Sequence, residues 1–184
     1  MTDQADGPGA PPEIHNPRTG QTMRFLVTAE ESGGTLLRIE TVNPPTGVEE
    51  PLHVHPHQEG RAEVRAGCLR FVVDGETRTV GPGESITIPA GVPHCFASDG
   101  PGDAVAIQEF RPALRTQAFF EHWFDIATRG ELDEHGSPPL LRAAVSAPAF
   151  GDEIRLTRPP WPVQRAVFAA LAPLGRRRGY APPG

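Results

Sequence analysis

Short runs of alternating apolar and polar residues fill the first two thirds of the chain. They are rich in branched side chains and are separated by glycine, proline or acidic turns: MRFLVTA, TLLRIETV, LRFVVDGETRTV, SITIPAG and AVAIQEF. Asp74-Gly75, between two apolar alternations, is a strong hairpin signal. Seven or more short strands at close spacing predict an antiparallel sandwich or small barrel. We place this mainly β unit at residues 14–112.

The apolar period changes to that of a helix after Pro112. TQAFFEHWFDIATRG carries aromatic residues at helical spacing, and PPLLRAAVSAPAF is a second candidate helix. PPWPVQRAVFAALAPLGRRRGY starts with prolines suited to a first helical turn and ends in arginines. We therefore expect residues 113–184 to form a helical extension that packs on the barrel or on a partner subunit. Residues 1–13 read as a disordered tail.

Composition and charge exclude several classes of protein. A net charge of −6 argues against a nucleic-acid binder. The N-terminus has no basic start followed by an apolar run, so it does not resemble a signal peptide, and no apolar stretch is long enough to span a membrane. We expect no membrane contact. The two cysteines, Cys68 and Cys95, lack zinc-motif spacing, which favours a reduced, cytoplasmic setting, while a single disulfide between them stays open.

Histidines are concentrated in one short stretch. GVEEPLHVHPHQEGRAEVRAG runs from Gly47 to Gly67 and holds His53, His55 and His57 within a few residues. Positions two apart on a strand face the same side, so His53 and His55 should project together. We expect His57 to lie on the rim.

A second motif follows in GPGESITIPAGVPHCFAS, where Gly83 precedes Pro89, Gly91 and His94 at fixed intervals. Together the two motifs resemble the conserved motif pair of the cupin superfamily, in the order found in a single-domain cupin. The resemblance covers residues 47–98 in detail. It implies a cupin β-barrel, a jelly roll or double-stranded β-helix, with a metal held in its mouth.

The resemblance assigns the metal to His53, His55 and His94. Three neutral imidazoles suit several divalent transition metals. Fe(II) is favoured because a three-histidine site without carboxylate resembles the iron dioxygenases of the superfamily, while Zn, Mn, Ni and Cu remain possible. Two alternatives stay open: the histidines are solvated loop residues, or the barrel has lost its metal.

The carboxylate departs from the cupin pattern. Counted back from Gly67, the position of the usual glutamate is Gly60; counted forward from His55, it is Glu59. A regular strand turns Gly60 inward and Glu59 outward, because a slip of one residue swaps faces. A bulge at Gly60 would turn Glu59 inward as a fourth ligand. We expect the regular strand.

The pocket beside the metal should be unusually open. Gly60 and Ala62 occupy positions where related cupins usually carry a glutamate and a bulky aromatic residue. Unless Phe71 or Phe96 fills this space, it can admit a larger substrate or extra waters. Gln108, on the last predicted strand, is a further candidate pocket residue.

Three function classes remain open, and we expect an enzyme. The first is a non-haem dioxygenase acting on a small organic substrate. The second is a redox-neutral Lewis-acid isomerase, cyclase or lyase of a secondary-metabolite pathway, which needs a proton carrier such as Glu59 or Glu109. The third is a non-catalytic ligand-binding cupin. Cupins commonly pair through their barrels, so we expect a homodimer.

Overall fold

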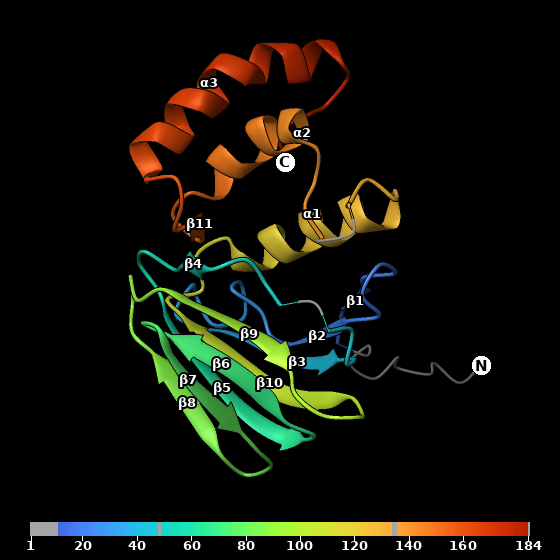
Figure 1. Ribbon diagram of the computed structural model, residues 1–184, viewed down its shortest axis with the longest axis vertical. Coiled ribbons are helices and arrows are strands. Elements are labelled where there is room, and N and C mark those ends of the chain that lie inside the picture. The colour runs from blue at the N-terminus through green and yellow to red at the C-terminus, as the bar shows by residue number, and fades with distance from the viewer. Residues whose placement is uncertain (1–10, 48, 134–135, 184) are drawn as a thin grey trace, which may run out of the picture.

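Two antiparallel sheets face each other and helices follow them, as Figure 1 shows. This arrangement comes from a computed structural model that describes residues 11–47, 49–133 and 136–183. Within those residues, the predicted mainly β fold with C-terminal helices is confirmed. Most of the tail expected at 1–13 lies outside the described residues, and the first strand begins at Glu13.

The larger sheet has the order β1-β2-β3-β10-β5-β8. Its strands are β1 (Glu13–His15), β2 (Thr22–Val27), β3 (Leu37–Asn43), β5 (Glu59–Ala66), β8 (Ser85–Ile88) and β10 (Ala104–Arg111). The smaller sheet has the order β11-β4-β9-β6-β7. Its strands are β4 (His53–Val54), β6 (Leu69–Val73), β7 (Glu76–Val80), β9 (His94–Ser98) and β11 (Arg155–Leu156).

Strict alternation builds the core between the sheets. Along β3, every second side chain from Leu37 to Asn43 is buried, as a strand with one face on the core requires. The main core cluster joins the two sheets through residues such as Val64 on β5 and Leu69 and Phe71 on β6. The predicted Asp74-Gly75 turn links β6 to β7, with Val73 paired to Glu76.

The helices are α1 (Thr116–Thr128), α2 (Leu140–Ser146) and α3 (Trp161–Arg177), with a short 3₁₀ turn at Ala147–Phe150. Figure 1 shows α1 lying across one end of the barrel, with α2 and α3 beyond it. Phe124 of α1 is buried in a cluster with Met23, Phe25 and Phe110 of the barrel. Among the described residues, no helix has the length and hydropathy needed to cross a membrane.

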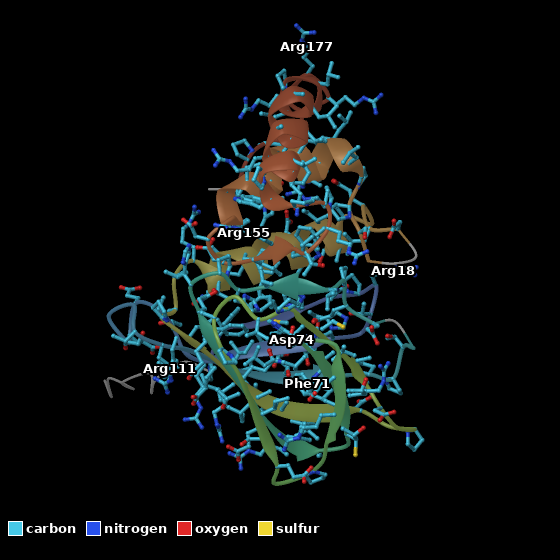
Figure 2. All side chains as sticks on the ribbon, turned by 60° about the vertical axis from the view of Figure 1, so that its left-hand side comes forward. Arg18, Phe71, Asp74, Arg111, Arg155 and Arg177 are labelled. Carbon is cyan, nitrogen blue, oxygen red and sulfur yellow. The ribbon has the colours of Figure 1, made fainter. Side chains whose placement is uncertain are left out.

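The chain returns to the barrel after the 3₁₀ turn. There β11 pairs with β4, so that Arg155 lies opposite Val54 and Leu156 lies opposite His53. The Arg155 guanidinium also stacks 4.9 Å from the ring centroid of Trp161 at the start of α3. Figure 2 shows Arg155 where the helical part meets the barrel and Phe71 at the level of the barrel itself. The C-terminal segment is thus attached directly to the strand that carries the first histidine.

Gly67 should tolerate no side chain. It turns the chain from β5 to β6 with φ of +65°, and a Cβ there would lie 2.5 Å from the carbonyl oxygen of Asp103. Both effects disfavour alanine, so we expect Gly67→Ala to lower the free energy of unfolding by about 1–3 kcal/mol. Urea titration measures the change. Gly60→Ala is the matched control, because a Cβ at Gly60 meets nothing within 4 Å; an equal loss in both variants would contradict this account.

Candidate metal centre

The three predicted histidines cluster where β4 and β9 of the smaller sheet lie side by side. His53 on β4 pairs directly with His94 on β9, and His55 follows one residue after β4 ends. Their ring centroids lie 4.4 Å apart for His53 and His94, 5.1 Å for His53 and His55, and 5.2 Å for His55 and His94. One nitrogen of each ring lies within 4.8 Å of the others. This cluster could hold a metal ion.

Hydrogen bonds select the nitrogen that each histidine presents. Nδ1 of His53 lies 2.8 Å from the Pro51 carbonyl oxygen, and Nδ1 of His94 lies 2.8 Å from that of Val92. Nδ1 of His55 lies 2.6 Å from the carbonyl oxygen of Glu153. A carbonyl only accepts, so each Nδ1 carries the proton and each Nε2 keeps a free lone pair. Such outer contacts fix the tautomer and ring orientation of metal-binding histidines.

Burial keeps the three rings neutral. Removal from water lowers the pKa of His53 to about 3, with further contributions from His94 and His55. Burial also lowers the pKa of His55 to about 4 and lowers that of His94. Neutral imidazoles are the form that binds metal, so no proton has to leave the cluster when an ion enters at neutral pH.

A cavity of about 250 Å³ opens beside the cluster. The predicted pocket residues all line it: Gly60, Ala62, Phe71, Phe96 and Gln108. Helix α1 also lines the cavity, through Phe119, Phe120, Trp123 and Phe124. The aromatic wall reaches the cluster itself, because the Phe110 ring lies 5.3 Å from His55 and 5.8 Å from Phe120.

Glu59 lies away from the histidines. It is exposed at the start of β5 and is not part of the cavity lining, whereas Gly60 and Ala62 line the cavity. β5 is regular here: Gly60 pairs with Ile88 and Ala62 with Ile86. The register shift in its pairing with β10 lies between Val64 and Ala66 instead. Because this irregularity lies between Gly60 and Gly67, counting residues back from Gly67 does not establish which face of the sheet Gly60 is on. The position of Gly60 in the cavity lining does establish it.

Glu109 is occupied by ion pairs. Its carboxylate lies 3.5 Å from Nε of Arg38 and 3.0 Å from a guanidinium nitrogen of Arg111. Both Glu109 and its buried neighbour Gln108 line the cavity. Two arginines hold the Glu109 carboxylate in place, so it is not free to approach a substrate as a proton carrier.

Two residues outside the sequence motifs belong to the site. Glu153, nearly 100 positions after His55 in the chain, orients His55 through its backbone carbonyl, and its buried side chain accepts the Arg115 backbone N–H. Glu50 lines the cavity, and burial raises its pKa to about 8. No signal in the sequence separates Glu50 from the adjacent Glu49, and none links Glu153 to the barrel.

Comparison with known proteins identifies the domain that holds the site. Residues 40–108 match the family model described as the cupin domain, and this span includes all three histidines. The protein carries a small cupin domain. Over 63 residues the chain is 40% identical to mannose-1-phosphate guanylyltransferase ManC of Salmonella typhimurium; the match covers 33% of this chain and 12% of that enzyme. The chain therefore corresponds to a small part of that relative.

Solved structures resemble the cupin domain over about half of this chain. The polyketide cyclase RemF of Streptomyces resistomycificus is 33% identical, with 50% of this chain and 65% of that chain covered and a TM-score of 0.43. A predicted oxalate decarboxylase of Thermotoga maritima is 20% identical, with 56% and 92% covered and a TM-score of 0.49. KdgF of Halomonas sp. is 19% identical, with 50% and 79% covered and a TM-score of 0.45.

The raised pKa of Glu50 predicts a specific pH dependence of stability. Its carboxyl has a pKa of 4.5 when solvated and about 8 when folded, so the folded state holds more protons between those values. The free energy of unfolding should therefore fall as pH rises through that window. Glu50→Gln removes this contribution. We expect the stability of the wild type relative to Glu50→Gln to fall by about 1–3 kcal/mol across the window, measured by urea unfolding.

The lowered pKa values of the histidines make stability rise with pH, which opposes the effect of Glu50. Both proteins contain these histidines, so their contribution cancels when the wild type is compared with Glu50→Gln. Glu76→Gln, at an exposed position on β7, is the control and should follow the wild type at every pH. Parallel pH profiles for wild type and Glu50→Gln would show that Glu50 is ionised at neutral pH in the folded protein.

Proposed function

We propose that this protein is an enzyme in which His53, His55 and His94 hold one divalent transition metal that binds a small organic substrate. The observation that supports it most is the common orientation of the three rings: every Nδ1 is bonded to a carbonyl, which leaves three Nε2 lone pairs for one ion. Such a buried cluster of neutral donors, whose Nε2 atoms have no hydrogen-bond partner among the residues that the structure describes, has the donor chemistry of a metal site.

The first candidate reaction is that of a non-haem dioxygenase with Fe(II). The cluster contains three neutral nitrogen donors, and in the described part of the chain no carboxylate belongs to it. An ion held there keeps its full positive charge and has open positions for other ligands. A bound metal would supply one-electron chemistry with O₂ if it is iron, or polarisation of a substrate oxygen if it is zinc.

The cavity lining favours a substrate with an apolar, ring-bearing body. Phe110 and Phe120 continue the wall outward from His55, and Trp123 and Phe124 close it from α1. Aromatic walls bind flat rings by offset or edge contacts and keep water out. The amide of Gln108 provides a polar group that can orient a substrate oxygen. The substrate is thus proposed to bind the metal through oxygen atoms while its ring lies against α1.

The second candidate is a redox-neutral isomerase, cyclase or lyase. Glu50 favours it, because such reactions move protons and this carboxyl lies in the same cavity as the histidines. Neither Glu59, which is exposed, nor Glu109, which is ion-paired, meets that need.

Metal exchange tests both candidates. The metal-free protein is titrated with Fe(II) or Zn(II) and assayed with a panel of ring-bearing hydroxy-carbonyl compounds for oxygen uptake and for rearranged products. Oxygen uptake with Fe(II) alone would support the dioxygenase. Product with Zn(II) under nitrogen would support the redox-neutral enzyme. Tight substrate binding without turnover by either form would contradict an enzyme and leave a ligand-binding cupin.

A further inference from the structure

Glu50 is a carboxyl group that lines the cavity together with the three histidines. It lies in the connection from β3 to β4, and its backbone N–H donates to the carbonyl oxygen of Phe96 at 3.3 Å. Phe96 is on β9, the strand that also carries His94. The backbone of Glu50 is thus bonded to the strand that carries His94.

The arginine beside this segment is already paired with the adjacent residue, Glu49. Arg70 lies 2.8 Å from the Glu49 carboxylate, which also accepts from Sγ of Cys95 at 3.3 Å. No hydrogen bond or ion pair joins the Glu50 side chain to any residue in the described part of the chain. The two adjacent glutamates therefore differ: Glu49 is held by ion pairing and Glu50 is not.

The other charged groups around the cavity are neutralised as well. Arg61 on β5 is paired with Glu63 at 3.1 Å, and Glu109 on β10 is paired with Arg38 and Arg111. The remaining titratable groups that line it are the three histidines, which are neutral.

Glu50 is half-buried in the cavity wall. Withdrawing an ionisable group from water without a partner costs stability, and proteins keep such groups mainly where they act. Burial alone raises the pKa of Glu50 to about 8, so the group holds its proton at neutral pH. A metal ion on the histidines would lower that pKa by its positive charge and bring it nearer to neutrality. A group that can both lose and regain a proton near the working pH is the most effective acid–base catalyst.

We propose that Glu50 is the acid–base residue of this site and that its substrates are α-hydroxycarbonyl compounds carrying an apolar ring. This inference rests on the proposed function, because the substrate's two oxygens would bind the metal. In the step, the C–H bond beside the carbonyl breaks, its electron pair stays on the substrate as an enolate, and the proton moves to Glu50. Glu50 accepts the proton in its carboxylate form. Return of the proton to the neighbouring carbon, with the hydroxyl proton passing from one substrate oxygen to the other, completes an isomerisation, so that no oxidant or reductant is required.

α-Hydroxyacetophenone is the probe for this step, since it has an aromatic ring, two chelating oxygens and exchangeable protons beside its carbonyl. Zn(II)-loaded wild type, Glu50→Gln and the control Glu76→Gln are incubated with the probe in D₂O, and proton NMR follows loss of the α-proton signal. We expect exchange in Glu50→Gln to be about 100-fold slower than in the wild type, with Zn(II) bound equally and Glu76→Gln unchanged.

A second readout does not depend on turnover. Infrared difference spectra of the metal-free protein on raising the pH should show the loss of one protonated carboxylic acid in the wild type and in Glu76→Gln, but not in Glu50→Gln. The inference is overturned if that band persists in Glu50→Gln, if the wild type does not exchange the probe, or if Glu50→Gln exchanges it at the wild-type rate. Failure of the wild type to bind Zn(II) would instead overturn the proposed function on which the inference rests.

Discussion

Replacing His53 by alanine is expected to abolish tight binding of one transition metal, while Glu59→Ala keeps it. His53 supplies one of three Nε2 lone pairs in the buried cluster, and its ring is fixed by the Pro51 carbonyl. Glu59 is exposed and lies outside the cavity lining. Changes to outer contacts of metal ligands cost about 10–100-fold in affinity, so loss of a ligand should cost more than about 100-fold.

Competition against a chromophoric chelator measures both affinities under one set of conditions. Circular dichroism of the two metal-free variants should match the wild type, which separates loss of a ligand from loss of the fold. If Glu59→Ala lost metal as completely as His53→Ala, the carboxylate would have to turn inward when metal binds, and the three-histidine site would be wrong.

Gln58→Leu should destabilise the protein by about 3–5 kcal/mol. The side chain is fully buried and its amide donates to the carbonyl oxygens of Pro112 and Ala113 at 2.8 and 3.1 Å. Its amide oxygen accepts a hydrogen bond from the buried hydroxyl of Thr116, the first residue of α1, at 3.1 Å. Leucine would leave all three groups without their partner, at about 1–3 kcal/mol each. Since Thr116 begins α1, which lines the cavity, the attachment of this helix to the barrel should weaken as well.

Gln117→Leu is the matched control for this prediction. Gln117 is the next residue of α1 after Thr116, and its side chain donates to Glu121 one turn along the same exposed helix face. Urea unfolding should show a change below about 0.5 kcal/mol for Gln117→Leu. Equal effects in the two variants would mean that the Gln58 network contributes little to holding α1 on the barrel.

The sequence predicted those features that depend on local periodicity. Alternation indicated the strands, and the spacing of His53 and His55 predicted that both would face one side. The turn at Asp74-Gly75 could also be predicted, because its conformation depends on those two residues alone. The third histidine, His94, came from the family resemblance, since no local pattern links it to the other two.

Features that depend on distant segments could not be predicted in this way. β11 is two residues long and pairs with β4 across about a hundred positions, so the contribution of Glu153 to His55 leaves no periodic signal. Glu50 differs from Glu49 only in what surrounds it after folding. Glu109 was a reasonable candidate base until the fold placed Arg38 beside it.

The most direct test of the three-histidine site is X-ray absorption at the zinc edge of the Zn(II)-loaded protein. We expect three imidazole nitrogens at about 2.0–2.1 Å from the metal, with the outer-shell scattering typical of histidine rings, and one further light-atom position that a substrate oxygen can take. The spectrum of Glu59→Ala should be the same. A first shell with fewer than three imidazoles, or one in which a Glu59-dependent carboxylate replaces a histidine, would contradict the three-histidine site.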